Sequence, residues 1–310
     1  MHTVLNAALP VFGLMLLGFL AGRSGRFEPS ATDTLNRFAF YFALPSLIFI
    51  AMTKVAPDQL RQFGFLAAFA GGAVVTCIAG YVISRAKGQP AADALIEGCN
   101  AGYSNVGFMG VPLCLLIFGR EGIAPAAMSV LLTACVQFLV AIILVELALK
   151  GGENLRKAVR QVLISLIRNP LFIAPLAGIT VSMTGLTVPA PLEQFALLLG
   201  NAAAPTALFC IGLSLAQTKL ASHDYAAIAR LTALKLLLQP AIAAALALYV
   251  FSLPKMWAQA AILLSALPIG SGIFTIAKTY ERDTGVTSGA ILTSHVVSVL
   301  TLSFLIALMV

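Results

Sequence analysis

Ten apolar stretches, each long enough to cross a bilayer, occupy most of this 310-residue chain. A membrane-spanning helix needs about 20 mostly apolar residues, because about 30 Å of hydrocarbon is crossed at about 1.5 Å per residue. Only 10% of the residues are charged, against roughly 25% in soluble domains. The sequence therefore predicts an all-α integral membrane protein with ten transmembrane helices, over residues 3–21, 33–52, 63–83, 91–118, 123–149, 170–184, 192–217, 226–251, 256–279 and 286–310.

The basic residues predict how these helices are oriented. The connections after the odd-numbered stretches, with the adjoining helix ends, hold 15 of the 19 Lys and Arg residues. Cytoplasmic connections carry such an excess, so we expect both termini on the periplasmic side of the inner membrane. The net charge of +7 is spread over these connections without a continuous basic stripe. We therefore expect the lipid bilayer, and no nucleic acid, as a partner.

The two halves of the sequence resemble each other. A shift of 160 positions (205 − 45 = 160) places Gly18 on Gly178 and Pro45 on Pro205. We interpret residues 1–150 and 169–310 as two five-helix repeats, and the second is inverted because five is odd. Inverted repeats are typical of secondary transporters.

Residues 151–168 connect the two predicted repeats. Within this segment, apolar residues recur at helical spacing opposite Arg156, Lys157 and Arg160. Such an amphipathic pattern predicts a linker helix on the cytoplasmic membrane surface.

Two apolar stretches contain residues that interrupt helices. Helices 4 and 9 carry glycine, proline and polar residues at corresponding places. Gly122 follows Gly107 by 15 positions, and Gly285 follows Gly270 by 15 positions. Matching interruptions of this kind indicate a substrate site at the membrane midplane, where half-helix N-termini face anionic groups. The alternative is that small residues merely permit close helix packing. The predicted substrate-binding residues are Asn100, Tyr103, Ser104, Asn105, Gly107, Gly110, Thr133, Gln137, Pro268, Gly270, Ser271 and Gly272.

Thr133 and Gln137 join this group because they are four residues apart on one face of helix 5. They could complete a polar pocket or bind a neighbouring helix. Helix kinks are expected at the prolines of three apolar stretches, Pro45, Pro112 and Pro205.

Ionisable residues inside apolar stretches are candidates for function. His295 is the deepest in its helix and is a candidate for proton coupling, unless it is a neutral side chain bonded to Ser294 or Ser298. Lys235, with Arg230 and Glu146, is expected instead to reach the cytoplasmic surface.

The runs from Ser104 to Leu113 and from Ala266 to Tyr280 resemble the fourth and ninth helices of the auxin efflux carrier family. The resemblance covers the whole chain. It implies a ten-helix fold related to the bile acid sodium symporters, in which helices 4 and 9 cross. It also implies scaffold helices 1, 2, 6 and 7, transport helices 3–5 and 8–10, an elevator mechanism and a homodimer formed through the scaffold helices.

The resemblance also bears on the substrate. It makes Asn105 the crossover asparagine and Thr133 a polar substrate contact. Plant auxin exporters carry prolines where Ser104 and Ile273 stand here, which points away from auxin. Bacterial members are linked with small dicarboxylates such as malate or malonate.

We therefore predict a secondary active transporter for a small organic anion such as a mono- or dicarboxylate. The alternatives are a sodium-coupled organic anion symporter and, from other classes, an intramembrane enzyme or a channel. No catalytic residue, metal site or cofactor is predicted, because the sequence lacks a nucleophile elbow and paired metal-ligand spacing.

The predicted orientation can be tested with reporters fused after Val310. The excess of Lys and Arg in the odd-numbered connections predicts a periplasmic C-terminus, so alkaline phosphatase should be active there and green fluorescent protein should be dark. A fusion within residues 151–154, on the opposite side, is the control. Fluorescence at the C-terminus would reverse the orientation.

Overall fold

The computed structural model describes residues 2–56, 61–150, 155–217, 224–282 and 284–309 and, except at residues 2–9, 29, 150 and 155, their side chains. The described chain is almost entirely helical, and its one isolated β-bridge joins Ser104 and Ile269. The α-helices are α1 (His2–Arg23), α2 (Pro29–Phe38), α3 (Leu44–Met52), α4 (Phe63–Ala86), α5 (Ala91–Gly102), α6 (Val111–Phe118), α7 (Ile123–Leu131), α8 (Phe138–Lys150), α9 (Leu155–Ile167), α10 (Pro170–Thr184), α11 (Ala190–Asn201), α12 (Ala203–Gln217), α13 (Tyr225–Ala233), α14 (Gln239–Ala245), α15 (Lys255–Ser265), α16 (Gly272–Thr279) and α17 (Thr284–Met309).

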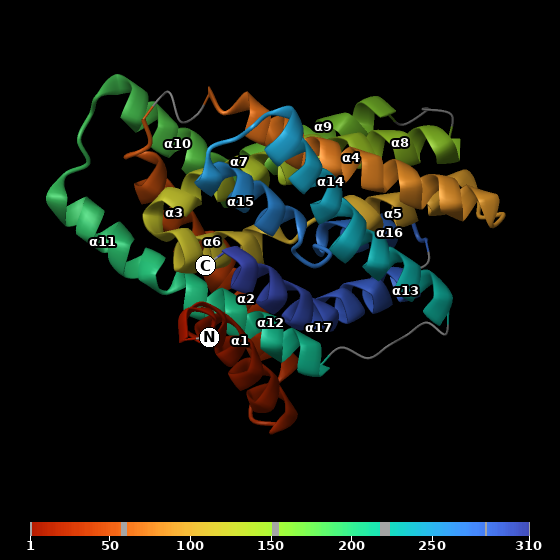
Figure 1. Ribbon diagram of the computed structural model, residues 1–310, viewed down its shortest axis with the longest axis horizontal. Helices are drawn as coiled ribbons and strands as arrows, with labels where there is room; N and C mark the ends of the chain where they lie inside the picture. Colours follow the sequence, from red (N-terminus) through yellow and green to blue (C-terminus); the bar gives the residue numbers. More distant parts are fainter. Residues whose placement is uncertain (1, 57–60, 151–154, 218–223, 283, 310) are drawn as a thin grey trace.

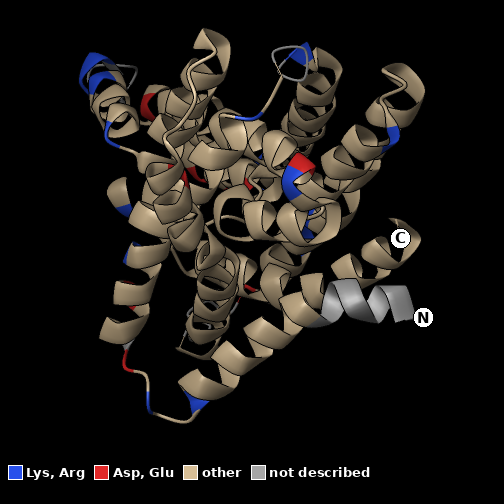
Figure 2. Cartoon of the chain, turned by 90° about the vertical axis from the view of Figure 1, so that its left-hand side faces the viewer, with Lys and Arg blue, Asp and Glu red and all other residues tan. Residues whose placement is uncertain are grey.

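The helices occupy the apolar stretches predicted from the sequence (Figure 1). Within the described residues, six helical segments are long and apolar enough to cross a bilayer, or seven if α9 and α10, bent by 58°, form one span. Figure 2 shows long runs of helix without a charged residue. Large apolar side chains such as Leu198 and Leu300 are 69% and 76% exposed on the outside, as expected where lipid is the solvent. The protein is a multi-pass membrane protein.

The helices are irregular near the three prolines for which kinks were predicted. Pro45 and Pro112 each follow a π-helical stretch, at Ala39–Ala43 and Val106–Gly110. A proline ring lacks the N–H and clashes with the carbonyl four residues earlier, and the wider π-turn accommodates that clash. Pro205 lies in the first turn of α12, directly after the break that separates α12 from α11.

Two glycine contacts join the first helix of each half of the chain to a helix of the other half. A Cβ built on Gly18 of α1 would lie 2.1 Å from the carbonyl oxygen of Phe209 on α12. A Cβ built on Gly178 of α10 would lie 2.6 Å from the carbonyl oxygen of Phe49 on α3. The absence of side chains lets these helix pairs approach closely, which is the main way that helices associate in a membrane.

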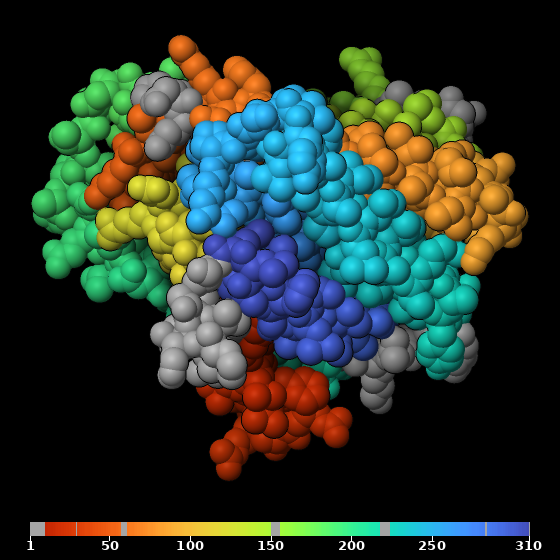
Figure 3. Space-filling model, in the orientation of Figure 1, coloured from red at the N-terminus to blue at the C-terminus, as the bar shows by residue number. Residues whose placement is uncertain are grey.

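Helix α17 packs against α13 along one face of the molecule, where the two lie side by side (Figure 3). Buried residues at their contact include Ile228, Leu231 and Ala290. This contact places the middle of α17, including His295, beside the interior of the protein, because the helix also contacts α5, α15 and α16.

The prediction that three charged residues reach the cytoplasmic surface is wrong for two of them. Lys235 is 0% exposed and Glu146 is 2% exposed. Arg230 is partly buried and forms an ion pair with Glu97. Lys235 instead turns inward, where its Nζ donates to the carbonyl oxygen of Ser265 at 2.7 Å. The sequence did not show that this face of the helix meets an interrupted helix.

Replacing Gly18 with alanine should destabilise the protein. The added Cβ would meet the Phe209 backbone, and overpacking costs roughly 1–3 kcal/mol. Gly13→Ala, on the same helix with nothing within 4 Å of its Cβ position, is the matched control and should be neutral or stabilising. Thermal unfolding of the detergent-purified variants would measure this, and equal midpoints for both would contradict the contact.

Candidate substrate site

Two interrupted helices meet in the middle of the protein. Helix α5 ends at Gly102, and helical structure resumes at Val106, while α15 ends at Ser265 and α16 begins at Gly272. The Asn105 N–H donates to the Pro268 carbonyl at 2.9 Å, and the Gly270 N–H donates to the Tyr103 carbonyl at 2.9 Å. We call residues 103–105 with 266–271 the crossing. Its two segments run antiparallel. Each segment satisfies backbone groups that lost their partners where the other helix is interrupted.

Side chains from neighbouring helices satisfy the carboxyl ends of both interrupted helices. Gln137 Nε2 donates to the carbonyl oxygen of Gly102 at 2.9 Å. Lys235 Nζ donates to the carbonyl oxygen of Ser265 at 2.7 Å. The last carbonyls of a helix have no partner within it, and inside a membrane they must find one in the protein. Gln137 therefore serves the backbone rather than an open cavity.

Tyr103 explains why glycines stand near the end of the crossing, at Gly270, and at the start of α16, at Gly272. A Cβ built on Gly272 would lie 2.6 Å from the Tyr103 hydroxyl, and one on Gly270 would lie 3.0 Å from its ring. Tyr103 thus covers these two glycines. Gly110 is different, since its Cβ position faces Leu264 at 2.8 Å. Gly110 lines neither of the two cavities at the crossing.

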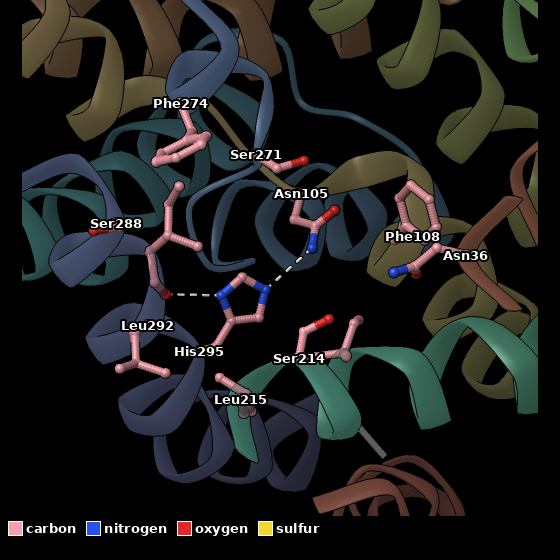
Figure 4. A pocket seen from close by; sticks show the side chains of 12 residues that line it. Asn36, Asn105, Phe108, Ser214, Leu215, Ser271, Phe274, Ser288, Leu292 and His295 are labelled. Atoms are coloured by element: carbon pink, nitrogen blue, oxygen red, sulfur yellow. Dashed lines mark hydrogen bonds between the residues drawn. The ribbon is translucent and has the colours of Figure 1, made fainter. Parts of the chain in front are cut away.

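The larger of two cavities at the crossing has a volume of about 450 Å³. Figure 4 shows its polar centre, where Asn105 and His295 face each other. Asn105 Nδ2 lies 3.1 Å from His295 Nε2, and His295 Nδ1 lies 2.8 Å from the carbonyl oxygen of Ile291. The cavity is lined by Asn36, Asn105, Phe108, Ile211, Ser214, Leu215, Ser271, Phe274, Ser288, Ile291, Leu292 and His295.

The second cavity has a volume of about 290 Å³. It shares Asn105, Phe108 and Ser271 with the first. Of the sequence-predicted residues, it is also lined by Tyr103, Ser104, Gly107, Thr133, Gly270 and Gly272. The rest of its wall comes mainly from α8, α9 and α10 and includes Ser165 and Asn169.

Thr133 lines this second cavity. It is buried, and its Oγ1 has no hydrogen-bond partner within the described part of the chain. A buried hydroxyl without a partner costs free energy, so a ligand or water that binds it would be favoured.

Like Gly110 and Gln137, two further predicted residues line neither cavity. Asn100 is fully buried and its Nδ2 donates to Thr287 Oγ1 at 2.9 Å. Pro268 contributes its carbonyl to the backbone pairing. Conversely, the sequence analysis missed Asn36, Phe108 and the α9 residues. Phe108 sits within the motif between two predicted glycines, which was a usable signal, whereas the other positions carry no local signal.

None of the residues that line the two cavities is Asp, Glu, Lys or Arg. The nearest acidic pair on the same interrupted helix is neutralised, since Asp93 accepts from Arg282 at 2.7 Å and Glu97 accepts from Arg230. The Asp93 carboxylate raises the pKa of Arg282 above its ordinary value. An anion in either cavity would thus face polar groups and helix N-termini without a free carboxylate among the lining side chains.

Comparison with known proteins agrees with this architecture. The sequence matches the family described as membrane transport protein over residues 3–306. A protein of Rhizobium meliloti (strain 1021) named "putative malonate transporter" is 29% identical over 311 residues, covering 99% of this chain and 96% of that protein.

Two further relatives are named as uncharacterized transporters. YfdV of Escherichia coli (strain K12) is 26% identical over 75% of this chain and 74% of its own. A protein of Methanothermobacter thermautotrophicus is 26% identical over 96% of this chain and 95% of its own. With the family match spanning nearly the whole sequence, the resemblance seen in the two motifs is confirmed, and the chain belongs to the membrane transport protein family of the auxin efflux carriers.

Proposed function

We propose that the protein is a secondary active transporter that carries a small organic anion across the inner membrane. One observation carries this proposal: Asn105, Phe108 and Ser271 line both cavities. A ligand held by these three residues could be reached from either cavity. Alternating access requires such a shared position.

The chemistry of the shared position favours an anion. Helical structure restarts directly after Asn105 and directly after Ser271. The first N–H groups of a helix lack partners within it, and together they carry a partial positive charge. Asn105 and Ser271 add side chains that can donate hydrogen bonds. A carboxylate of one or two charges would fit this set of donors.

Ten membrane passes in two inverted repeats are part of the proposal. The segment Val106–Leu149 is 44 residues long, which is too much helix for one pass at about 20 residues each. Gly119 has φ +65°, a conformation outside the helical region, so two passes meet there. The glycine contacts of Gly18 with Phe209 and Gly178 with Phe49 exchange with each other under the 160-position shift, which supports the repeats.

From this architecture we further propose an elevator mechanism, a homodimer and periplasmic termini. The scaffold would contain α1–α3 and α10–α12, whose helices pair through the two glycine contacts. The transport bundle would contain the interrupted helices and their neighbours. The two cavities lie where these two groups meet, since α2 and α12 line the larger one and α10 lines the smaller.

Sodium coupling is less well supported than carriage of the anion alone. Coupling cations in transporters bind at half-helix carboxyl ends and unwound carbonyls. Here the carbonyl oxygen of Ser265, at the carboxyl end of α15, already accepts a hydrogen bond from Lys235 Nζ. Malonate is the first substrate to test, because one relative's name mentions it.

Asn105→Ala should weaken malonate binding by about tenfold to a hundredfold. The change removes a hydrogen bond to a charged group, worth roughly 1.5–3 kcal/mol. Binding of malonate to purified protein can be measured by calorimetry or by thermal shift. Asn201→Ala is the matched control, because Asn201 is exposed on α11 and lines neither cavity.

Two results would contradict the proposed function or the proposed site. If the wild-type protein binds and transports no small carboxylate, the proposed function is wrong. If Asn105→Ala and Ser271→Ala both fold and bind malonate with wild-type affinity, the site lies elsewhere.

A further inference from the structure

The hydrogen bonds around His295 fix which ring nitrogen carries the proton when the side chain is neutral. A backbone carbonyl can only accept, so His295 Nδ1, 2.8 Å from the carbonyl oxygen of Ile291, carries the ring proton. The other nitrogen, Nε2, is then unprotonated and accepts. The group that donates to it at 3.1 Å is the amide nitrogen of Asn105.

This arrangement determines what Asn105 presents to a ligand. Because Nδ2 is turned toward His295, the amide oxygen points the other way, as Figure 4 shows. An amide oxygen accepts hydrogen bonds and carries partial negative charge. In the neutral site, therefore, Asn105 turns its amide oxygen, an acceptor, to where a carboxylate needs donors, and His295 occupies one of its two N–H groups.

Protonation of His295 reverses which of the two side chains, His295 or Asn105, must donate the hydrogen bond between them. Both ring nitrogens of a protonated histidine are donors, so Nε2–H would face an N–H group of Asn105 in the present orientation. Rotation of the Asn105 amide by half a turn resolves the conflict. The amide oxygen then accepts from Nε2–H, and the amide nitrogen turns its N–H groups toward the cavity.

Resting on the proposed function, we infer that His295 and Asn105 couple one proton to one anion. The proton binds His295 Nε2, the Asn105 amide turns, and the carboxylate is held by the N–H groups that this turn presents. The loaded site thus contains a proton and an anion together. By reciprocity, the anion also strengthens binding of the proton.

No other ionisable side chain competes for this role within the described part of the chain. His295 is the one titratable residue that lines the larger cavity. On the helices packed against α17, Arg230 and Glu97 pair with each other, Asp93 pairs with Arg282, and Lys235 binds a carbonyl. The remaining groups on neighbouring helices do not line this cavity, and they are Arg23, Asp33, Arg37, Cys99, Tyr103, Tyr225, Lys255 and Lys278.

Calorimetric titration with malonate at pH 7.5 tests the coupling on the full-length protein. Titration in two buffers of different ionisation enthalpy gives the number of protons taken up per malonate bound. Malonate is already a dianion at this pH, so the uptake belongs to the protein. The wild type should take up close to one proton, and its affinity should rise by up to about tenfold for each pH unit lowered.

His295→Gln is the decisive variant. A glutamine can accept from Asn105 but cannot be protonated, so proton uptake should vanish and the affinity should not depend on pH. Ser303→Ala, two turns along α17 with its hydroxyl bonded to the Val299 carbonyl, is the control and should keep the wild-type uptake.

Each result decides between the proposals. Malonate binding without proton uptake by the wild type, or uptake that persists in His295→Gln, overturns the coupling and leaves the proposed carrier intact. The wild-type measurement decides even if His295→Gln does not fold. Absence of carboxylate binding at every pH overturns the proposed function itself, and the coupling with it.

Discussion

The backbone at the crossing must satisfy its hydrogen bonds without water, and the rest of the structure depends on this constraint. Breaking two helices inside hydrocarbon leaves N–H and carbonyl groups that cost several kcal/mol each if unpaired. The protein pairs them with each other, between Asn105 and Pro268 and between Tyr103 and Gly270. Gln137 and Lys235 satisfy the carboxyl ends. In the proposed function, the amino ends of the helices that restart after Asn105 and Ser271 hold the ligand.

Asn105 connects this backbone framework to the ionisable interior. Its main chain is part of the pairing, and the residue contacts His295 through its side chain and lines both cavities. A change in the protonation of His295 therefore alters what Asn105 presents to a ligand, and a bound ligand alters what Asn105 presents to His295. This geometry explains how a site without a charged lining residue could still bind charge selectively, because one proton changes a fixed acceptor into a donor.

The sequence predicted the helices and the interruptions well, because each depends on local composition. The apolar runs specify helices, and the glycines near 107 and 270 with Pro268 specify the breaks. It predicted less of what depends on contacts between distant residues. His295 and Asn105 are 190 positions apart, and the inward turn of Lys235 depends on where α15 ends. Residues lining the cavities from α2 and α9 gave no local signal either.

Helix α9 forms part of a wall, although the sequence suggested a surface linker. Val162, Ser165 and Leu166 line the smaller cavity, and Asn169, the N-cap residue of α10, lines it too. A version of this protein assembled from two separately expressed halves would thus need its cut before Leu155. Divided there, the second half would keep the lining residues of α9 and Asn169 on one chain. Divided at residue 168, it would lose the chain that joins α9 to α10.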